Sequence, residues 1–255
     1  MNKYPLISII TATFNSGDVL EELIRSVISQ TYNNYEFIII DGHSTDATVN
    51  IIEKYQQHIK YWISEPDTGI YEAWNKGLKV ATGEWIAFIG SDDVFLPNAL
   101  QDYVNFINSL NEPKLEYVSS KIHLVRKDGK LIKTYGQPWV WNRSKLINTI
   151  AHPGSLHHRS LFDTYGDFNT KYRICSDYEF LLRPGINFVT AFLDKVTVKM
   201  AQGGASFNET KLFREHYDAT ITTGKQNRFI AKYVFLKHML KSYVKRSLRI
   251  FGVNI

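Results

Sequence analysis

The chain has 255 residues, of which 44% are hydrophobic and 14% aromatic, so a disordered chain is excluded and a sizeable core can be buried. Its net charge of +5 is uneven: residues 225–255 carry eight Lys and Arg and no acidic side chain, whereas the rest holds 22 basic and 25 acidic residues. Because the body is slightly acidic, no nucleic acid partner is expected.

The first hundred residues alternate short apolar strands with helical patterns, which is typical of βαβ units and a parallel sheet. The run from Phe37 to Ile40 is apolar at every position, so this strand should be covered on both faces. In chain order the patterns predict a strand at Leu6–Thr11, a helix at Asp18–Thr31, a strand at Glu36–Ile40, a helix at Ala47–Gln57, a strand at Tyr61–Ser64, a helix at Ile70–Ala81 and a strand at Glu84–Ile89.

The second half of the chain has a different pattern, in which a hairpin makes the predicted sheet mixed. Its turn is an Asp-Gly turn formed by Lys127, Asp128 and Gly129. The predicted elements are a helix at Pro97–Leu110, hairpin strands at Tyr117–Val125 and Lys130–Tyr135, a loop-like region at Gly136–Ser155 and an apolar strand at Phe188–Met200.

The C-terminal segment is predicted to form a basic amphipathic helix. Apolar residues recur at helical spacing from Phe229 to Phe251 with Lys and Arg around them. No apolar run is long enough to span a membrane. The helix is therefore expected to lie on an anionic lipid surface, with docking on the body or a dimer interface as alternatives.

A single cysteine, Cys175, excludes an intramolecular disulfide and favours a reducing, cytoplasmic compartment. A small buried side chain is the usual role of free cysteine, so this role is favoured over that of a nucleophile. The apolar stretch that starts at Leu6 is too short for a secretory signal with a cleavage site, so export is not expected.

Polar turns follow the four strands predicted in the first hundred residues, and three of these turns carry acids: Asp41, Asp67 and the pair Asp92 and Asp93. Ligands of open parallel sheets bind beyond the carboxyl ends of the strands. Converging carboxylates repel one another unless a cation or a hydrogen-bonding ligand lies between them, which favours Mn²⁺ or Mg²⁺ and a hydroxyl-rich substrate. Each acid taken singly is also an ordinary turn former or helix N-cap.

Three stretches within residues 5–205 read I-S-I-I-T-A-T-F-N from Ile7, S-V-I-S-Q-T-Y-N-N-Y-E-F-I-I-I-D-G-H-S-T-D-A-T from Ser26, and D-T-G-I-Y-E-A-W-N-K-G-L-K-V-A-T-G-E-W-I-A-F-I-G-S-D-D from Asp67. Together they resemble glycosyltransferase family 2. The resemblance implies an α/β GT-A fold, a Rossmann-like mixed sheet flanked by helices, here with a C-terminal helical appendage. It also implies a nucleotide-diphosphate sugar as donor, with UDP-sugars favoured, and a divalent cation.

The resemblance further implies site residues. It implies donor contacts at Thr11, Thr13, Phe14, Asn15, Asp41 (nucleobase), Asp67 and Asp92 (ribose), and metal contact at Asp93. Two positions depart from the family pattern. Gly90 stands where many relatives carry an additional Asp, and Ser176 precedes Asp177 where a Glu-Asp pair is common.

Sugar transfer requires a base for the acceptor hydroxyl, and we assign that role to Asp177, with a helix N-cap as the alternative. Direct displacement would invert the anomeric centre. Acceptor contacts are expected at His152, Trp139, Gly203 and Gly204, although aromatic residues often pack in cores and Gly-Gly is also an ordinary turn.

The expected organisation is a catalytic domain at residues 1–205, with a nucleotide-sugar half (1–110) and an acceptor half (111–205), followed by a helical tail at 206–255. The resemblance implies an inverting hexosyltransferase of bacterial surface-polysaccharide assembly (O-antigen, capsule or exopolysaccharide). Its saccharide acceptor would be free or lipid-linked, and the enzyme would be cytoplasmic and peripheral on the inner face of the plasma membrane. The alternative is a non-catalytic nucleotide-sugar binding protein.

Two other classes are disfavoured by missing residues. A phosphatase of the haloacid dehalogenase type needs a second Asp two positions after Asp41, where His43 stands. A dinucleotide oxidoreductase needs a Gly-x-Gly-x-x-Gly fingerprint, which is absent between Thr11 and Gly17.

Overall fold

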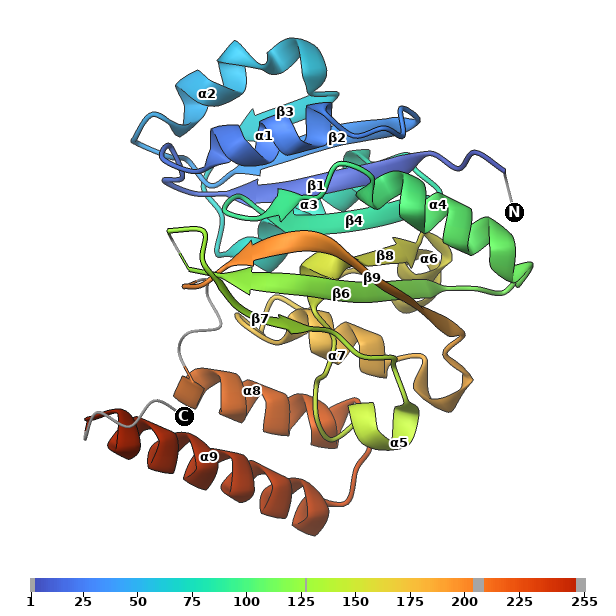
Figure 1. Cartoon of the computed structure of the whole chain (residues 1–255). Coiled ribbons are helices and arrows are strands. Elements are labelled where there is room, and N and C mark those ends of the chain that lie inside the picture. Colours follow the sequence, from blue (N-terminus) through green and yellow to red (C-terminus); the bar gives the residue numbers. More distant parts are fainter. Residues whose placement is uncertain (1–2, 127, 204–208, 251–255) are drawn as a thin grey trace.

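The computed structural model describes residues 3–126, 128–203 and 209–250. Within these residues nine strands form one mixed sheet in the order β3-β2-β1-β4-β8-β6-β9-β5, with β7 paired to β6 (Figure 1). The strands are β1 (Ile7–Thr13), β2 (Tyr35–Asp41), β3 (Tyr61–Ser64), β4 (Trp85–Gly90), β5 (Val94–Phe95), β6 (Tyr117–Val125), β7 (Leu131–Tyr135), β8 (Ser155–His158) and β9 (Thr190–Ala201).

Helices cover the sheet and extend beyond it at one end. They are α1 (Leu20–Ile28), α2 (Thr48–Lys54), α3 (Ile70–Val80), α4 (Ala99–Leu110), α5 (Trp141–Ser144), α6 (Ser160–Tyr165), α7 (Ser176–Leu182), α8 (Glu209–Thr222) and α9 (Arg228–Ile250), with 3₁₀ turns at η1 (Gln56–His58), η2 (His152–Gly154) and η3 (Gly185–Asn187). In Figure 1, α8 and α9 lie side by side at the end of the molecule remote from β1–β3, and α7 lies between them and the sheet.

The core has two layers, one on each face of the sheet. Ile7 and Ile9 of β1 pack with α1 and α4, whereas Ile10 packs with α3 on the opposite face. Ile38 and Ile40 of β2 join the α3 layer, and Ile39 joins the other layer. This alternation follows from the two-residue period of a strand, and it confirms that β2 is covered on both faces.

The βα alternation of the first half and the mixed sheet are confirmed. β3, β2, β1 and β4 are parallel, and β8 then runs antiparallel to both β4 and β6. The predicted hairpin is the antiparallel pair β6–β7. Gly129 in its turn has φ 78°, where glycine is favoured, while Lys127 lies outside the described residues.

The sequence prediction was wrong about several boundaries. β1 continues to Thr13 because Thr13 still pairs with Asp41 in β2, so Thr11 and Thr13 lie within the strand rather than after it. The loop-like region predicted at Gly136–Ser155 contains α5 and η2 and ends at the first residue of β8. β5 and β8 were missed because they have two and four residues and are stabilised by distant partners.

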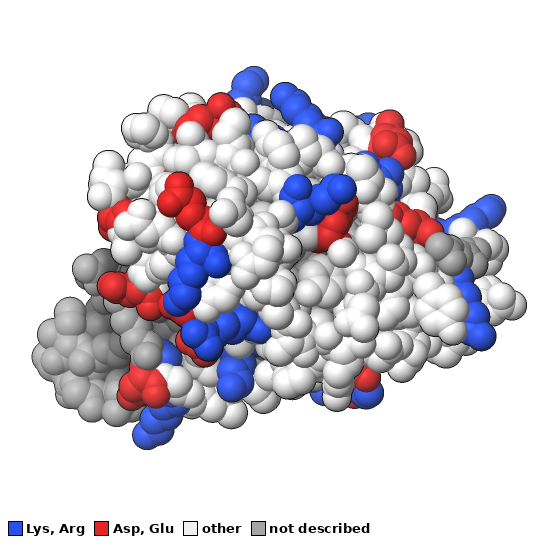
Figure 2. Space-filling view, turned by 90° about the horizontal axis from the view of Figure 1, so that it is seen from above, with Lys and Arg blue, Asp and Glu red and all other residues white. Residues whose placement is uncertain are grey.

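Charge is mixed on the face displayed in Figure 2, where Lys and Arg alternate with Asp and Glu and no large patch of one sign is visible. Among the helices of the described residues, none is long and apolar enough to cross a bilayer.

Candidate active site

The turns after β1 and β2 are linked to each other by side-chain hydrogen bonds. Asn15 has a backbone φ of 47°. Its backbone N–H donates to Ser44 Oγ at 2.8 Å, and its side-chain Oδ1 accepts from the Thr45 N–H at 2.9 Å. Gly42 N–H donates to the carbonyl of Thr13 at 2.9 Å. The two turns therefore form one fixed edge at the carboxyl ends of the strands.

Asp41 is fully buried, and its carboxylate holds this edge together. It accepts hydrogen bonds from the Ser44 N–H (2.9 Å), Ser44 Oγ (2.5 Å) and Ser64 Oγ (2.6 Å). These internal bonds use most of the roughly four acceptor positions of a carboxylate. Asp41 thus has a clear structural role, joining the turn after β2 to the end of β3.

Asp67 lies beside Gly42 and Phe14. A Cβ at position 42 would lie 2.9 Å from Asp67 Oδ2 and 3.4 Å from Phe14 Cδ2, so glycine leaves open the space between the carboxylate and the aromatic ring. Phe14 is 63% exposed. Burial raises the pKa of Asp67, although its Oδ1 accepts a 2.7 Å hydrogen bond from the Gly69 N–H. An exposed ring and a partly buried carboxylate here would suit a planar polar ligand.

Asp92 and Asp93 occupy the turn between β4 and β5. Asp93 is 4% exposed, and its carboxylate accepts bonds of 3.2 Å from the N–H groups of Gly90 and Ala201. Burial and the neighbouring Asp92 charge raise the pKa of Asp93 well above its usual range, and burial also raises the pKa of Asp92. Two adjacent carboxylates with raised pKa values are a site that a cation would stabilise.

The donor set fits a divalent cation that shares its coordination with phosphate. The described residues contain no group of three or more His, Cys, Asp or Glu side chains placed to hold a metal. Mg²⁺ commonly binds through one or two carboxylates and completes its octahedron with substrate phosphates and water. A Cβ at Gly90 would lie 3.0 Å from Asp92 Oδ1 and 3.1 Å from Asp93 Oδ2, so any larger residue at this position would crowd both carboxylates.

Asp177 lies in the first turn of α7. The Tyr71 hydroxyl lies 3.0 Å from Asp177 Oδ1 and 2.7 Å from the Ile174 carbonyl, so its single proton is shared between these two acceptors. The alternative prediction, that Asp177 caps the helix, is wrong. The N-cap residue is Cys175, with no side-chain capping bond, because the helix begins one residue before Asp177. The Asp177 carboxylate is therefore not used as a helix cap.

The loop before Asp177 is anchored by Glu215 of α8. Its carboxylate accepts hydrogen bonds from the N–H groups of Arg173 (3.0 Å), Ile174 (2.7 Å) and Cys175 (3.1 Å). Nothing in the sequence pattern indicated this contact, because the donors are backbone groups of a distant segment. Tyr71 was also missed, since at its helical position it reads as an ordinary core aromatic.

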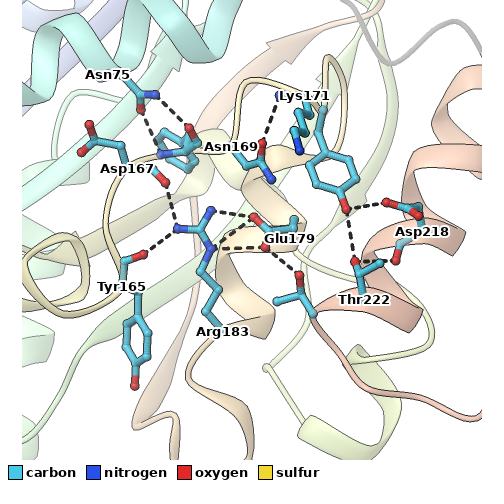
Figure 3. Close-up of polar contacts among 12 residues, drawn as sticks. Asn75, Tyr165, Asp167, Asn169, Lys171, Glu179, Arg183, Asp218 and Thr222 are labelled. Atoms are coloured by element: carbon cyan, nitrogen blue, oxygen red, sulfur yellow. Dashed lines mark hydrogen bonds and ion pairs between the residues drawn. The ribbon is translucent and has the colours of Figure 1, made fainter.

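More polar contacts fix α7 against residues 165–167 and the end of α8, and join the loop before α7 to α8 (Figure 3). Arg183 pairs with Glu179 at 2.6 Å and donates to the carbonyls of Tyr165 and Asp167. The hydroxyl of Tyr172 donates to Asp218 Oδ2 at 2.7 Å, and Thr223 Oγ1 donates to Glu179 at 2.7 Å. The position of α7 thus depends on α8.

One cavity of about 680 Å³ brings together several of the predicted residues: Asp92, Asp93, Asp177, His152 and Gly203 all line it. Gly203 has φ 127°, whereas Gly204 lies outside the described residues. His152 stacks on Trp74 with ring centroids 5.1 Å apart, and burial lowers its pKa, so its imidazole is neutral at neutral pH. Neither ring nitrogen has a hydrogen-bond partner among the described residues.

Other predicted residues do not line this cavity. Trp139 is 8% exposed and packs edge-on against Phe188, with ring centroids 5.8 Å apart. This is the core packing that the sequence offered as the alternative to an acceptor contact. Thr11 is fully buried within β1, and Thr13 is nearly so. Phe14, Asn15, Asp41 and Asp67 lie on the neighbouring turns at the ends of β1, β2 and β3.

Acidic residues at the ends of parallel strands, with Asp92, Asp93 and Asp177 on one cavity, are the arrangement expected of the GT-A class of nucleotide-sugar enzymes. Residues 8–174 match the family model "Glycosyl transferase family 2". A "PGL/p-HBAD biosynthesis glycosyltransferase" of Mycobacterium bovis is 30% identical over 214 residues, which cover 80% of this chain and 77% of that protein. The chain belongs to glycosyl transferase family 2, and it is a glycosyltransferase with a nucleotide-sugar donor.

Solved structures confirm the GT-A fold. Staphylococcus aureus TarS superposes with a TM-score of 0.66 at 20% identity, over 91% of this chain, which spans 42% of that longer protein. The mannosyltransferase PcManGT from Pyrobaculum calidifontis, in complex with GDP-Man and Mn²⁺, superposes with a TM-score of 0.65 at 15% identity. The match covers 95% of this chain and 75% of the mannosyltransferase. At such identities the likeness shows the fold alone.

The anchor of the 173–175 loop gives a first prediction. Glu215→Ala should leave three backbone N–H groups without their carboxylate, and leaving buried polar groups unpaired costs about 1–3 kcal/mol of folding stability. We also expect a severalfold lower kcat at unchanged donor KM, because the loop leads directly to Asp177. Chemical denaturation and steady-state kinetics measure both effects, with Arg214→Ala on the exposed face of α8 as the control. Wild-type stability and kcat in Glu215→Ala would contradict the anchoring role.

Proposed function

We propose that the chain is an inverting glycosyltransferase that uses a divalent cation and moves one sugar from a nucleoside-diphosphate sugar to an acceptor hydroxyl. The observation that carries the proposal is the single cavity that Asp92, Asp93 and Asp177 all line. The diphosphate would lie at Asp92 and Asp93, and the acceptor hydroxyl would approach Asp177. Direct attack from the side opposite the diphosphate would invert the anomeric centre.

In the proposed reaction Asp177 accepts the proton of the acceptor hydroxyl while its oxygen forms the bond to the anomeric carbon. The bond between that carbon and the diphosphate breaks, and the nucleoside diphosphate leaves. Tyr71, whose hydroxyl shares its proton between Asp177 Oδ1 and the Ile174 carbonyl, would help to orient the carboxylate. A divalent cation bound through Asp93 would offset the negative charge of the leaving diphosphate.

The donor contacts follow the turns of the first three strands. Phe14 and Asp67 flank the space that Gly42 leaves open, so we assign the nucleobase to this place, with Asn15 and Thr13 supporting the turn. Asp41 would contact the base while holding the turn through Ser44 and Ser64. Asp92 is assigned to the ribose and Asp93 to the metal.

The acceptor side is assigned to the part of the chain after residue 110. His152 and Gly203 line the cavity and would contact an acceptor saccharide, with Gly204 beyond the described residues and Trp139 acting through packing. We propose that the enzyme acts in bacterial surface-polysaccharide assembly. We also propose that the chain divides into a catalytic domain at residues 1–205 and a helical tail at residues 206–255.

The test is turnover with UDP-, GDP- and dTDP-sugars, with and without Mn²⁺. We expect at least one donor, with UDP-sugars favoured, to release its nucleoside diphosphate faster when Mn²⁺ is present. Donor binding without turnover, across donors and saccharide acceptors, would support the non-catalytic binding protein instead.

We also propose that the outer face of α9 lies on a membrane surface at the cytoplasmic side. Phe229, Tyr233, Leu236 and Leu240 are more than half exposed along this face, and Lys232 and Lys237 lie beside them. An exposed apolar stripe with flanking cations suits an anionic bilayer surface.

Vesicle flotation tests the membrane proposal. Leu236→Asp should reduce binding to vesicles that contain anionic lipid by severalfold, because it places a charge in the apolar stripe. Ile186→Asp, at an exposed apolar residue outside α9, is the matched control and should float like the wild type. Equal flotation of all three proteins would remove the proposal.

A further inference from the structure

The lining of the active-site cavity changes character from one side to the other. Its acids are Asp92, Asp93 and Asp177. On the other side α8 and α9 contribute mainly apolar or aromatic side chains, which we call the α8–α9 wall: Leu212, Phe213, Tyr217, Ala231, Val234 and Phe235. The same two helices also contribute the polar residues His216, Thr220 and His238 to the lining. Figure 1 shows α8 and α9 farther from the donor strands β1 and β4 than α7 is. The wall thus faces the acceptor side of Asp177.

The α8–α9 wall is a packed apolar surface. Tyr217 of α8 and Phe235 of α9 contact each other, with ring centroids 5.3 Å apart. His216, beside the wall, stacks on Tyr178 at 4.3 Å, and burial lowers its pKa to about 4, so its ring is neutral at neutral pH. Leu146 and Ile147 line the same cavity.

A free sugar would gain few hydrogen-bond partners from the six side chains of this wall, because Tyr217 alone among them carries a polar group, so most sugar hydroxyls placed against it would lose water without replacement. An alkyl group would gain from being buried there. The cavity volume of about 680 Å³ lies within the roughly 300–1,000 Å³ typical of ligand pockets.

We infer that the acceptor is an amphiphile whose alkyl chain binds the α8–α9 wall while its hydroxyl faces Asp177. The inference rests on the proposed function, because it takes Asp177 as the place of the acceptor hydroxyl. The two faces of α9 favour a lipid chain as the occupant. The inner face of the helix lines the cavity, and its outer face carries exposed Phe229, Tyr233 and Leu236 beside cationic residues.

The test compares the binding of methyl, octyl and phenyl glucosides to the full chain by calorimetry, below the micelle concentration. Octyl glucoside should bind at least tenfold more tightly than methyl glucoside. Equal affinities for the two would overturn the inference. Phenyl glucoside that matches octyl glucoside would also overturn it, since the wall would then select a ring rather than an alkyl chain.

Variants on the two faces of α9 localise the effect. Val234→Asp should abolish the preference for octyl over methyl glucoside. Val234→Thr, which keeps the volume of the side chain, should reduce this preference severalfold and serves as the test if Val234→Asp does not fold. Leu236→Asp, on the outer face, should keep the preference. A preference that survives in folded Val234 variants would contradict the assignment to this wall.

A donor titration on the same samples separates this inference from the proposed function. Mn²⁺-dependent turnover of a nucleotide sugar together with no chain-length preference would overturn the alkyl site alone. A chain-length preference without turnover of any donor would instead overturn the proposed transferase reaction.

Discussion

Asp177→Asn should bind the donor as the wild type does and lose most of its transfer activity. Removing a general base typically costs about 10²–10⁴-fold in rate. The amide keeps the size of the side chain and can still accept the 3.0 Å hydrogen bond from Tyr71, so the local structure should persist. The measurement is kcat with the best donor, together with nucleotide affinity by calorimetry.

The control for this variant is Asp163→Asn, which changes an exposed carboxylate on α6 that does not line the cavity. It should behave as the wild type. Equal transfer rates for Asp177→Asn and the wild type would exclude Asp177 as the base, and a loss of donor affinity equal to the loss of rate would make it a binding residue.

Asp93→Asn should remove the effect of Mn²⁺ on donor binding. Asp93 is nearly fully buried beside Asp92, and burial and repulsion, which raise its pKa, leave its charge uncompensated within the described part of the chain, where the proposed metal would compensate it. We expect the donor affinity in Mn²⁺ to fall to the metal-free level, a loss of at least tenfold. Titrations of the nucleotide with and without Mn²⁺ measure this change.

The stability of Asp93→Asn provides a check on folding. Burial raises the pKa of Asp93 above its unfolded value, so the ionised carboxylate destabilises the metal-free folded state as pH rises through that raised pKa. The neutral amide removes this cost, but its NH2 group cannot accept, so one of the two 3.2 Å backbone hydrogen bonds is lost. The metal-free variant should therefore melt close to the wild type at neutral pH, and an unfolded variant would contradict this account.

Much of the donor half could be predicted from local pattern. The alternation of short apolar runs with helical patterns predicted β1 to β4 and α1 to α3, because each of these elements is long enough to show its own periodicity in the sequence. The acidic residues of the donor half were found for the same reason, since Asp41 is the last residue of β2 and Asp67 and Asp93 closely follow β3 and β4. Asp41 shows the limit of this reasoning: its bonds to Ser44 and Ser64 depend on how β3 lies against β2.

The acceptor half could be predicted less well, because its contacts join distant segments. β8 is a four-residue strand, Ser-Leu-His-His, held by β4 on one side and β6 on the other. The parallel pairing of β6 with β9 has no local signal. Glu215 anchors backbone groups about forty residues away, and only the packing of α8 against α7 brings them together.

A crystal structure with a hydrolysis-resistant nucleotide sugar and Mn²⁺ tests the central claim most directly. We predict the diphosphate beside Asp92 and Asp93, with Mn²⁺ bound to Asp93 and the anomeric carbon turned toward Asp177. A nucleotide bound elsewhere, or a sugar whose reactive face points away from Asp177, would contradict it.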